Sequence, residues 1–131
     1  VLAAIAYPAY TDSVLKGKRA QARTAILELL QQQERYMTQR NAYLQFSNTA
    51  GTTNPVSAAS TFKVFSGDSA TNPAYWLSTD LCGTLAITEC VQVTATPVQA
   101  DAAVGSLSMT SNGVKACSGT VSASNFKLCW P

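Results

Sequence analysis

The sequence contains no histidine. Its absence removes the usual general base, the commonest metal ligand and the residue that activates serine or cysteine nucleophiles. Phosphate-binding motifs of the G-x-x-x-x-G-K and G-x-G-x-x-G kinds are also missing. The carboxylates are scattered rather than paired, as at Asp68, Asp80, Glu89 and Asp101. We therefore expect no enzymatic activity, no cofactor and no metal site, and we assign Asp80 and Asp101 to turn capping.

Charge of either sign is scarce. Only 12% of the 131 residues are charged, and nine Lys and Arg against seven Asp and Glu leave a net charge of +2. A protein with so small an excess lacks the strong field that binds nucleic acid or membrane surfaces non-specifically, so any such binding must be local. The length predicts a single domain over residues 1–131.

The cysteines contain no C-x-x-C pair. All four lie in the last 50 residues, at Cys82, Cys90, Cys117 and Cys129. Structural zinc and redox sites favour closely spaced pairs, so two structural disulfides in an oxidising compartment are the better interpretation. Four cysteines allow three pairings, which the spacing leaves open. We favour Cys82 with Cys90 and Cys117 with Cys129, because each bridge then closes a short segment.

Residues 1–43 contain one glycine and one proline among good helix formers, which predicts one long helix. Apolar side chains recur at three- and four-residue steps from Val14 onward, at Val14, Leu15, Ala22, Ile26, Leu29, Leu30, Tyr36 and Met37. The first dozen residues have no polar stripe. We therefore expect this front part to enter lipid or the core of another subunit, the alternative being that it packs on the core of its own domain.

The composition then changes to Ser, Thr, Asn, Gly and Val. Residues 44–60 are predicted to form a surface loop, and 61–131 a sheet with a disulfide-linked C-terminal region. Short β-branched or alternating runs predict strands at 61–65, 74–78, 84–88, 91–96 and 105–110, and Asn112-Gly113 predicts a hairpin turn. A helix followed by an antiparallel sheet is an α+β fold in which the apolar stripe covers one sheet face.

Several segments resemble type IV pilins. The run from Leu2 to Tyr10, L-A-A-I-A-Y-P-A-Y, is similar to the second half of the N-terminal pilin segment. The stretches Q-V-T-A-T-P from Gln92, G-S-L-S-M from Gly105, N-G-V-K from Asn112 and the ending C-W-P are similar to the tail of PilE-type minor pilins. That subgroup usually has a cysteine where this chain has Val104, which leaves Cys117 to pair with Cys129.

The resemblance implies a structural subunit of an extracellular type IV pilus, and most closely a minor pilin. It implies other pilin subunits in a helical filament and the inner-membrane assembly machinery as partners, with anchoring in the inner membrane through the N-terminal helix before assembly. Open, non-closing contacts generate such filaments. We expect Leu2, Ile5 and Tyr7 to form intersubunit contacts. The alternatives are a specialised binding pilin (a DNA uptake receptor or an adhesin for a host surface), the major pilin, and a type II secretion pseudopilin.

Two groups of cations are candidate ligand sites. Lys16, Arg19 and Arg23 would align on one helix face, where we expect solvation or contact with acids of a neighbouring subunit. The alternatives for this face are lipid headgroups before assembly and the phosphates of DNA. A second group combines cations for phosphates with aromatic rings for stacking and would suit DNA or a surface ligand. Its members are Lys63, Lys115 and Lys127, with Trp76 and Trp130. For the two tryptophans we favour the alternative that they pack in the core.

Overall fold

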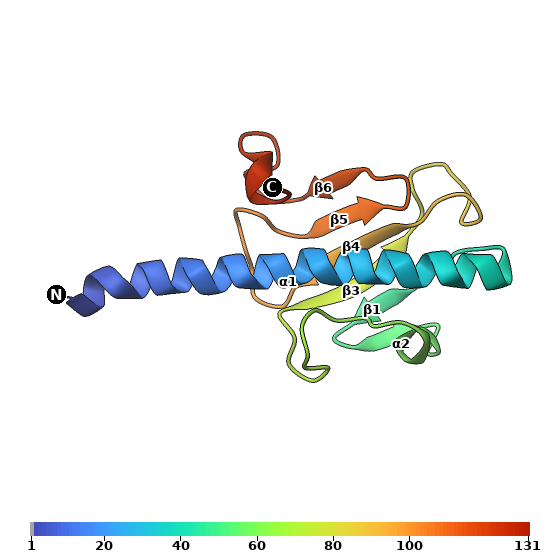
Figure 1. Cartoon of the computed structure of the whole chain (residues 1–131), viewed down its shortest axis with the longest axis horizontal. Coiled ribbons are helices and arrows are strands. Elements are labelled where there is room, and N and C mark those ends of the chain that lie inside the picture. The colour runs from blue at the N-terminus through green and yellow to red at the C-terminus, as the bar shows by residue number, and fades with distance from the viewer. Residues whose placement is uncertain (1) are drawn as a thin grey trace.

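The computed structural model describes the backbone of residues 2–131 and the side chains of residues 11–131. One long helix lies across an antiparallel sheet, and the N-terminal part of the helix extends beyond it (Figure 1). The elements in chain order are α1 (Leu2–Arg40), β1 (Ser47–Thr49), β2 (Thr52–Asn54), α2 (Ala58–Thr61), β3 (Tyr75–Asp80), β4 (Gln92–Pro97), β5 (Leu107–Thr110), β6 (Lys115–Cys117) and the 3-10 turn η1 (Phe126–Leu128). The predicted α+β arrangement is confirmed.

α1 ends three residues before the predicted boundary. Asn41 adopts a left-handed conformation with φ of 61°, and its N–H donates to the carbonyl of Met37 at 2.7 Å. A left-handed residue after the last turn is a common way to end a helix, and asparagine tolerates this conformation better than most residues. None of the helices in the described part of the chain is long and apolar enough to cross a membrane.

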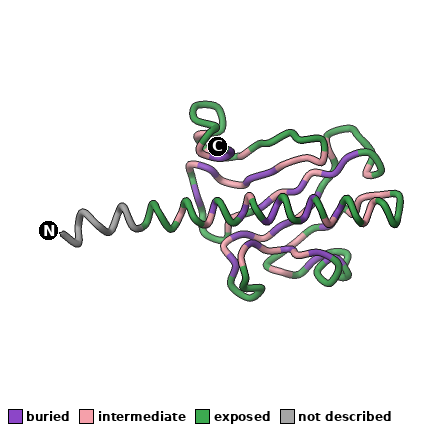
Figure 2. The backbone as a smooth tube through the Cα atoms, in the orientation of Figure 1, coloured by how far each residue is buried: buried purple, intermediate pink, exposed green. Residues whose placement is uncertain are grey.

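The larger sheet has the strand order β3-β4-β5-β6, with every neighbouring pair antiparallel. Residues in register share a face, so Leu77, Ala95 and Leu107 form one row beneath α1. All three are fully buried, as are Ala22, Ile26 and Leu29 on the facing side of the helix. Figure 2 shows this burial alternating along α1 and along the strands. Burying a large aliphatic side chain contributes about 1.5–3 kcal/mol, so this interface is the main attachment of the helix.

The predicted loop over residues 44–60 is wrong in part, because β1, β2 and the first three residues of α2 form within it. The hairpin of β1 and β2 is fixed by Asn48, whose amide donates to the carbonyls of Val64 and Leu77 at 3.1 and 2.8 Å. Residues 61–65, predicted as a strand, do not form one either. Instead, Leu77 donates to the carbonyl of Val64 and an isolated bridge joins Phe65 to Trp76, so this segment covers the β3 edge of the sheet.

The predicted strand at 84–88 is also wrong. These residues form turns inside a loop closed by the Cys82–Cys90 disulfide, whose Cα atoms lie 5.7 Å apart. Backbone hydrogen bonds from Glu89 and Cys90 to the carbonyl of Ala86 fix the turns. The second disulfide joins Cys117 to Cys129. The favoured pairing of neighbouring cysteines is therefore the one observed.

Gly119 lies where two backbone segments meet. A Cβ atom at this position would overlap the carbonyl oxygen of Ala103, and the Gly119 N–H donates to the carbonyl of Val104 at 2.9 Å. Replacing Gly119 with alanine should therefore push the segments apart and lower the free energy of unfolding by about 1–3 kcal/mol. Thermal or urea unfolding measures the loss. Gly17→Ala is the matched control, because a Cβ atom added there on α1 would meet no neighbouring element within 4 Å; equal losses in both variants would contradict the argument.

Candidate nucleic-acid interface

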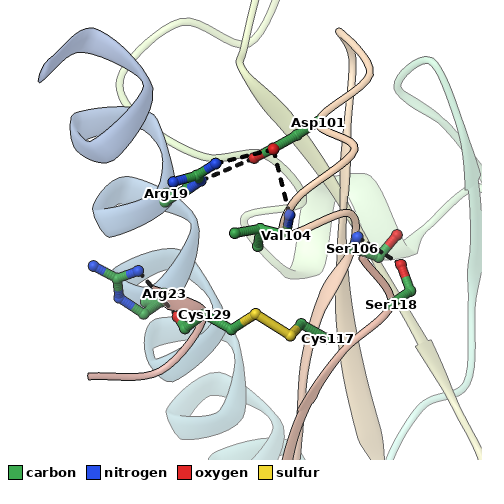
Figure 3. A network of polar contacts seen from close by, with 8 residues as sticks. All are labelled: Arg19, Arg23, Asp101, Val104, Ser106, Cys117, Ser118 and Cys129. Carbon is green, nitrogen blue, oxygen red and sulfur yellow. Dashed lines mark hydrogen bonds and ion pairs between the residues drawn. A yellow bond between two sulfur atoms is a disulfide. The ribbon is translucent and has the colours of Figure 1, made fainter. Parts of the chain in front are cut away.

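The C-terminal segment, residues 126–131, lies between β6 and α1. The Cys117–Cys129 disulfide joins it to β6, and the indole N–H of Trp130 donates to the carbonyl of Ala116 at 3.0 Å. On the helix side, a guanidinium nitrogen of Arg23 donates to the carbonyl of Cys129 at 3.1 Å (Figure 3). Cys129 and Trp130 are buried by these contacts. Three separate elements are thus brought together around the last residues of the chain.

Three cations surround this segment. Arg23 contacts it from α1, the Lys115 ammonium lies 5.4 Å from the centre of the Trp130 ring, and Lys127 is exposed on η1, two residues before Cys129. Neither of the ion pairs found among the described residues involves these three side chains. We call Arg23, Lys115 and Lys127 the C-terminal cationic face. Burial lowers the pKa of the Arg23 guanidinium, and the nearby Arg19 charge acts in the same direction.

Arg19 does not belong to this face, which corrects the prediction of one solvated stripe with Lys16 and Arg23. Its guanidinium is buried and binds both carboxylate oxygens of Asp101, at 2.9 and 3.0 Å (Figure 3). The hydrogen bonds from Arg19 hold the pKa of the Asp101 carboxyl below its ordinary value. Asp101 also accepts the N–H of Val104, so the turn-capping role predicted for it is observed alongside the ion pair. Arg19 is therefore neutralised within the subunit.

Lys63 lies away from Lys115 and Lys127. The carbonyl of its neighbour Val64 accepts a hydrogen bond from β3, at one edge of the sheet. Lys115 belongs to β6 at the opposite edge, and β6 lies about 14 Å from β3, across three strand spacings. The Lys63 ammonium lies 3.6 Å from Glu28 and 5.2 Å from the centre of the Phe65 ring. The single patch predicted from the three lysines is therefore two separate groups.

The two tryptophans are separated in the same way. Trp76 belongs to β3 and lies beneath the β1–β2 hairpin, where a Cβ atom on Gly51 would come within 3.0 Å of its ring. Trp130 packs at the β6 edge. The side chains of Leu2, Ile5 and Tyr7, predicted to form intersubunit contacts, lie outside the described residues.

Residues 8–119 match the model of the family described as type IV minor pilin ComP, DNA uptake sequence receptor. The chain belongs to this family of type IV minor pilins. The match contains the described globular part of α1, the whole sheet and the Cys82–Cys90 loop, and it ends before Lys127 and Trp130. A search of curated protein sequences gave no match. The expected filament subunit is thus confirmed at the level of the minor pilin, and this is a structural and binding family associated with pili.

Sequence reasoning missed the central contact of this pilin. Arg19 and Asp101 are 82 residues apart, and neither stands in a motif that singles it out as half of a pair. The helical spacing correctly placed Arg19 and Arg23 one turn apart, but the burial of Arg19 depends on where the segment after β4 crosses the helix. The proximity of Lys115 to the chain end could be inferred only through the pairing of Cys117 with Cys129.

Proposed function

We propose that this minor pilin binds DNA on the outer surface of a pilus and that its C-terminal cationic face holds the phosphate backbone. The description of the family, a DNA uptake sequence receptor, supports the ligand. The observation that carries the choice of site is that Arg23, Lys115 and Lys127 gather around one cross-linked segment while no carboxylate forms an ion pair with them in the described chain.

The electrostatics of the face suit a local contact with phosphates. Lysine and arginine side chains that neutralise phosphates release condensed counterions, so the affinity falls with rising salt. The net charge of +2 gives little long-range attraction, and most of the electrostatic binding then depends on these side chains. Three phosphate contacts would give a logarithmic salt slope of about −2.7 on duplex DNA.

Lys115→Ala and Lys127→Ala should each weaken binding to duplex DNA and reduce the salt slope by about 1, because each removes one phosphate contact. Fluorescence anisotropy with a labelled duplex, measured across a salt series, gives both the affinity and the slope. Both lysines are exposed, so we expect the stability of the two variants to match that of the parent.

Lys63→Ala is the matched control for these two variants. It removes the same charge, but from the opposite edge of the sheet, where Glu28 already pairs with the lysine. DNA affinity should remain at the parent value. An equal loss in Lys63→Ala and Lys115→Ala would show that net charge rather than a local face controls binding, and salt-independent binding in the parent would remove the proposal.

The resemblance of the C-terminal stretches to PilE-type minor pilins also supports a narrower classification of this pilin. We infer that this pilin belongs to the PilE-type subgroup and packs with other pilin subunits in a helical filament. Before assembly by the inner-membrane machinery, its N-terminal helix would be held in the inner membrane and its globular part would lie in the periplasm. The apolar run from Val1 to Tyr10 supports a non-aqueous partner for that end of the helix.

A further inference from the structure

The face of the larger sheet that is turned away from α1 carries polar side chains. Successive residues of a strand point to opposite faces, so the residues that follow or precede the buried row of Leu77, Ala95 and Leu107 lie on this side. They form two rows across β3, β4 and β5, with each residue in register with the next. The rows are Ser78, Thr94 and Ser108, and Asp80, Gln92 and Thr110. We call these six residues the outer polar face.

Two open depressions adjoin on this face. One, of about 510 Å³, lies between the β1–β2 hairpin and the strands β3 and β4, and its lining includes Asn48, Asn54 and Thr94. The other, of about 300 Å³, lies between the Cys82–Cys90 loop and the strands β5 and β6, and its lining includes Ser108. The two depressions meet at β4, because Thr94 of the first is in register with Ser108 of the second. A continuous polar surface therefore runs from the hairpin to the disulfide-closed loop.

Several hydroxyl and amide groups on this face have no partner. The side chains of Ser78, Gln92, Thr94 and Ser108 make no hydrogen bond within the part of the chain that the structure describes. Ser108 is the clearest case, since it is only 8% exposed and yet lines the second depression. Leaving a desolvated polar group without a partner is costly, so a ligand that hydrogen-bonds to such groups gains affinity.

The charges of this surface disfavour an anionic ligand. Among the described residues that line the two depressions there is no lysine or arginine, and Asp80 is the one ionisable side chain. Lys115 is in register with Met109 and Val93, so its side chain lies on the face toward α1. A ligand with phosphates or carboxylates would therefore meet a like charge and no counterion. Hydroxyl and amide groups both donate and accept hydrogen bonds, which suits a neutral ligand rich in hydroxyls.

We propose that the outer polar face binds a neutral glycan chain, which lies across the strands from the β1–β2 hairpin to the Cys82–Cys90 loop. The glycan hydroxyls pair with the unpartnered groups of Thr94 and Ser108. Leu85 and Val114, which are 38% and 61% exposed at the second depression, contact the apolar faces of the sugar rings. This binding uses the side of the sheet opposite Lys115 and is a function in addition to DNA binding. A pilin with this surface would attach to polysaccharide.

Titration of the isotope-labelled full chain with hexasaccharides, followed by NMR, tests both the binding and its location. The neutral probes are maltohexaose, cellohexaose and mannohexaose, and hexagalacturonate is the charged probe of equal length. At least one neutral probe should bind with a Kd of about 1 mM or lower and shift the amide resonances of β3, β4, β5 and residues 82–90. Hexagalacturonate should bind at least about tenfold more weakly, because its carboxylates would lie beside Asp80.

Thr94→Val and Ser108→Ala should each weaken this binding by about three- to tenfold, because each removes one hydrogen-bonding group. Neither substitution should lower the free energy of unfolding, since both hydroxyls lack a partner in the described chain. Thr96→Val is the matched control. Thr96 lies on the same face of β4 but outside both linings, so this variant should bind the glycan like the parent.

Three results would each overturn the proposal: no binding of any neutral probe up to about 10 mM, resonance shifts confined to the α1 side of the sheet, or hexagalacturonate binding as tightly as the neutral probes. Equal losses in Thr96→Val and Thr94→Val would overturn the placement of the glycan. DNA affinity should stay at the parent value in Thr94→Val and Ser108→Ala. Failure of the glycan site and failure of the C-terminal cationic face are therefore distinguishable.

Discussion

Replacing Asp101 with asparagine is expected to lower the free energy of unfolding by about 3 kcal/mol, measured by urea unfolding near neutral pH. The substitution preserves the shape of the side chain but leaves the buried Arg19 guanidinium without its counterion. Both side chains are nearly inaccessible, with 6% and 4% of their surfaces exposed, so water cannot replace the lost contact. Removing one member of a buried ion pair is costly because the remaining charge stays desolvated.

The same substitution should change how stability depends on pH. In the folded protein the pKa of Asp101 is held below its ordinary value of 3.8 by Arg19. A carboxyl with a lowered folded pKa contributes stability above its unfolded pKa and loses that contribution as the pH falls through the folded value. The stability difference between parent and Asp101→Asn should therefore be constant above about pH 5 and narrow below about pH 4.

A double substitution separates the cost of an unpaired charge from the value of the pair. Arg19→Met alone should destabilise the protein, whereas Arg19→Met combined with Asp101→Leu should recover part of the loss, because no buried charge then remains. Strictly additive losses would contradict this explanation. If the stability difference between the parent and Asp101→Asn stayed constant in acid, the lowered pKa assigned to Asp101 would be contradicted.

Removing the Cys117–Cys129 disulfide by replacing both cysteines with alanine should cost about 3 kcal/mol of stability on the chain-entropy model, since the bridge closes a loop with a sequence separation of 12. DNA affinity should also fall by more than in Lys127→Ala. The bridge holds Trp130 and Lys127 near Lys115 and Arg23, and without it these cations no longer share a fixed arrangement. Calorimetry and anisotropy measure the two effects.

The Cys82–Cys90 bridge provides the control. It closes a loop of similar size, with a separation of 8, but at the end of the sheet where β3 gives way to β4. Replacing this pair with alanine should lower stability by a comparable amount and leave DNA affinity unchanged under conditions where the protein is folded. Loss of DNA binding in both double variants would mean that overall stability, and not the C-terminal arrangement, controls the affinity.

The parts of the fold that sequence reasoning predicted are those governed by repeating local patterns. The apolar stripe matched the buried face of the helix between Ala22 and Leu30, although Val14 at its start is exposed. The alternation matched the buried faces of β3 and β4, and Asn112-Gly113 lies at the turn between β5 and β6. The run 84–88 has the same alternation at Leu85 and Ile87, yet a disulfide with a sequence separation of 8 forces turns there. The β1–β2 hairpin has little apolar pattern and depends on Asn48 bonding to distant carbonyls.

The candidate site was harder to predict from the sequence, because it also depends on contacts between distant segments. Its lysines are isolated from one another in the sequence, and only the strand order decides that Lys115 and Lys63 lie at opposite edges. The cysteine pairing was predictable because short loops are favoured. The Cys117–Cys129 bridge places Lys127, two residues before Cys129, near the β6 edge. No local signal distinguishes Arg19, which is buried, from Arg23, which contacts the chain end, since both occupy the same helical stripe.

Both disulfides lie within the sheet half of the chain, and all four cysteines are outside α1. Apart from the main chain beyond Arg40, the described part of the helix is attached to the sheet by apolar packing, the Arg19–Asp101 pair and hydrogen bonds such as that from Arg23. Mechanical load applied to the N-terminal end of α1 would therefore reach the sheet first through these non-covalent contacts. The Cys82–Cys90 bridge lies outside this path, whereas the contact from Arg23 to Cys129 would pass part of the load to the Cys117–Cys129 bridge. Arg19–Asp101 would be among the first contacts of the globular part to bear the force.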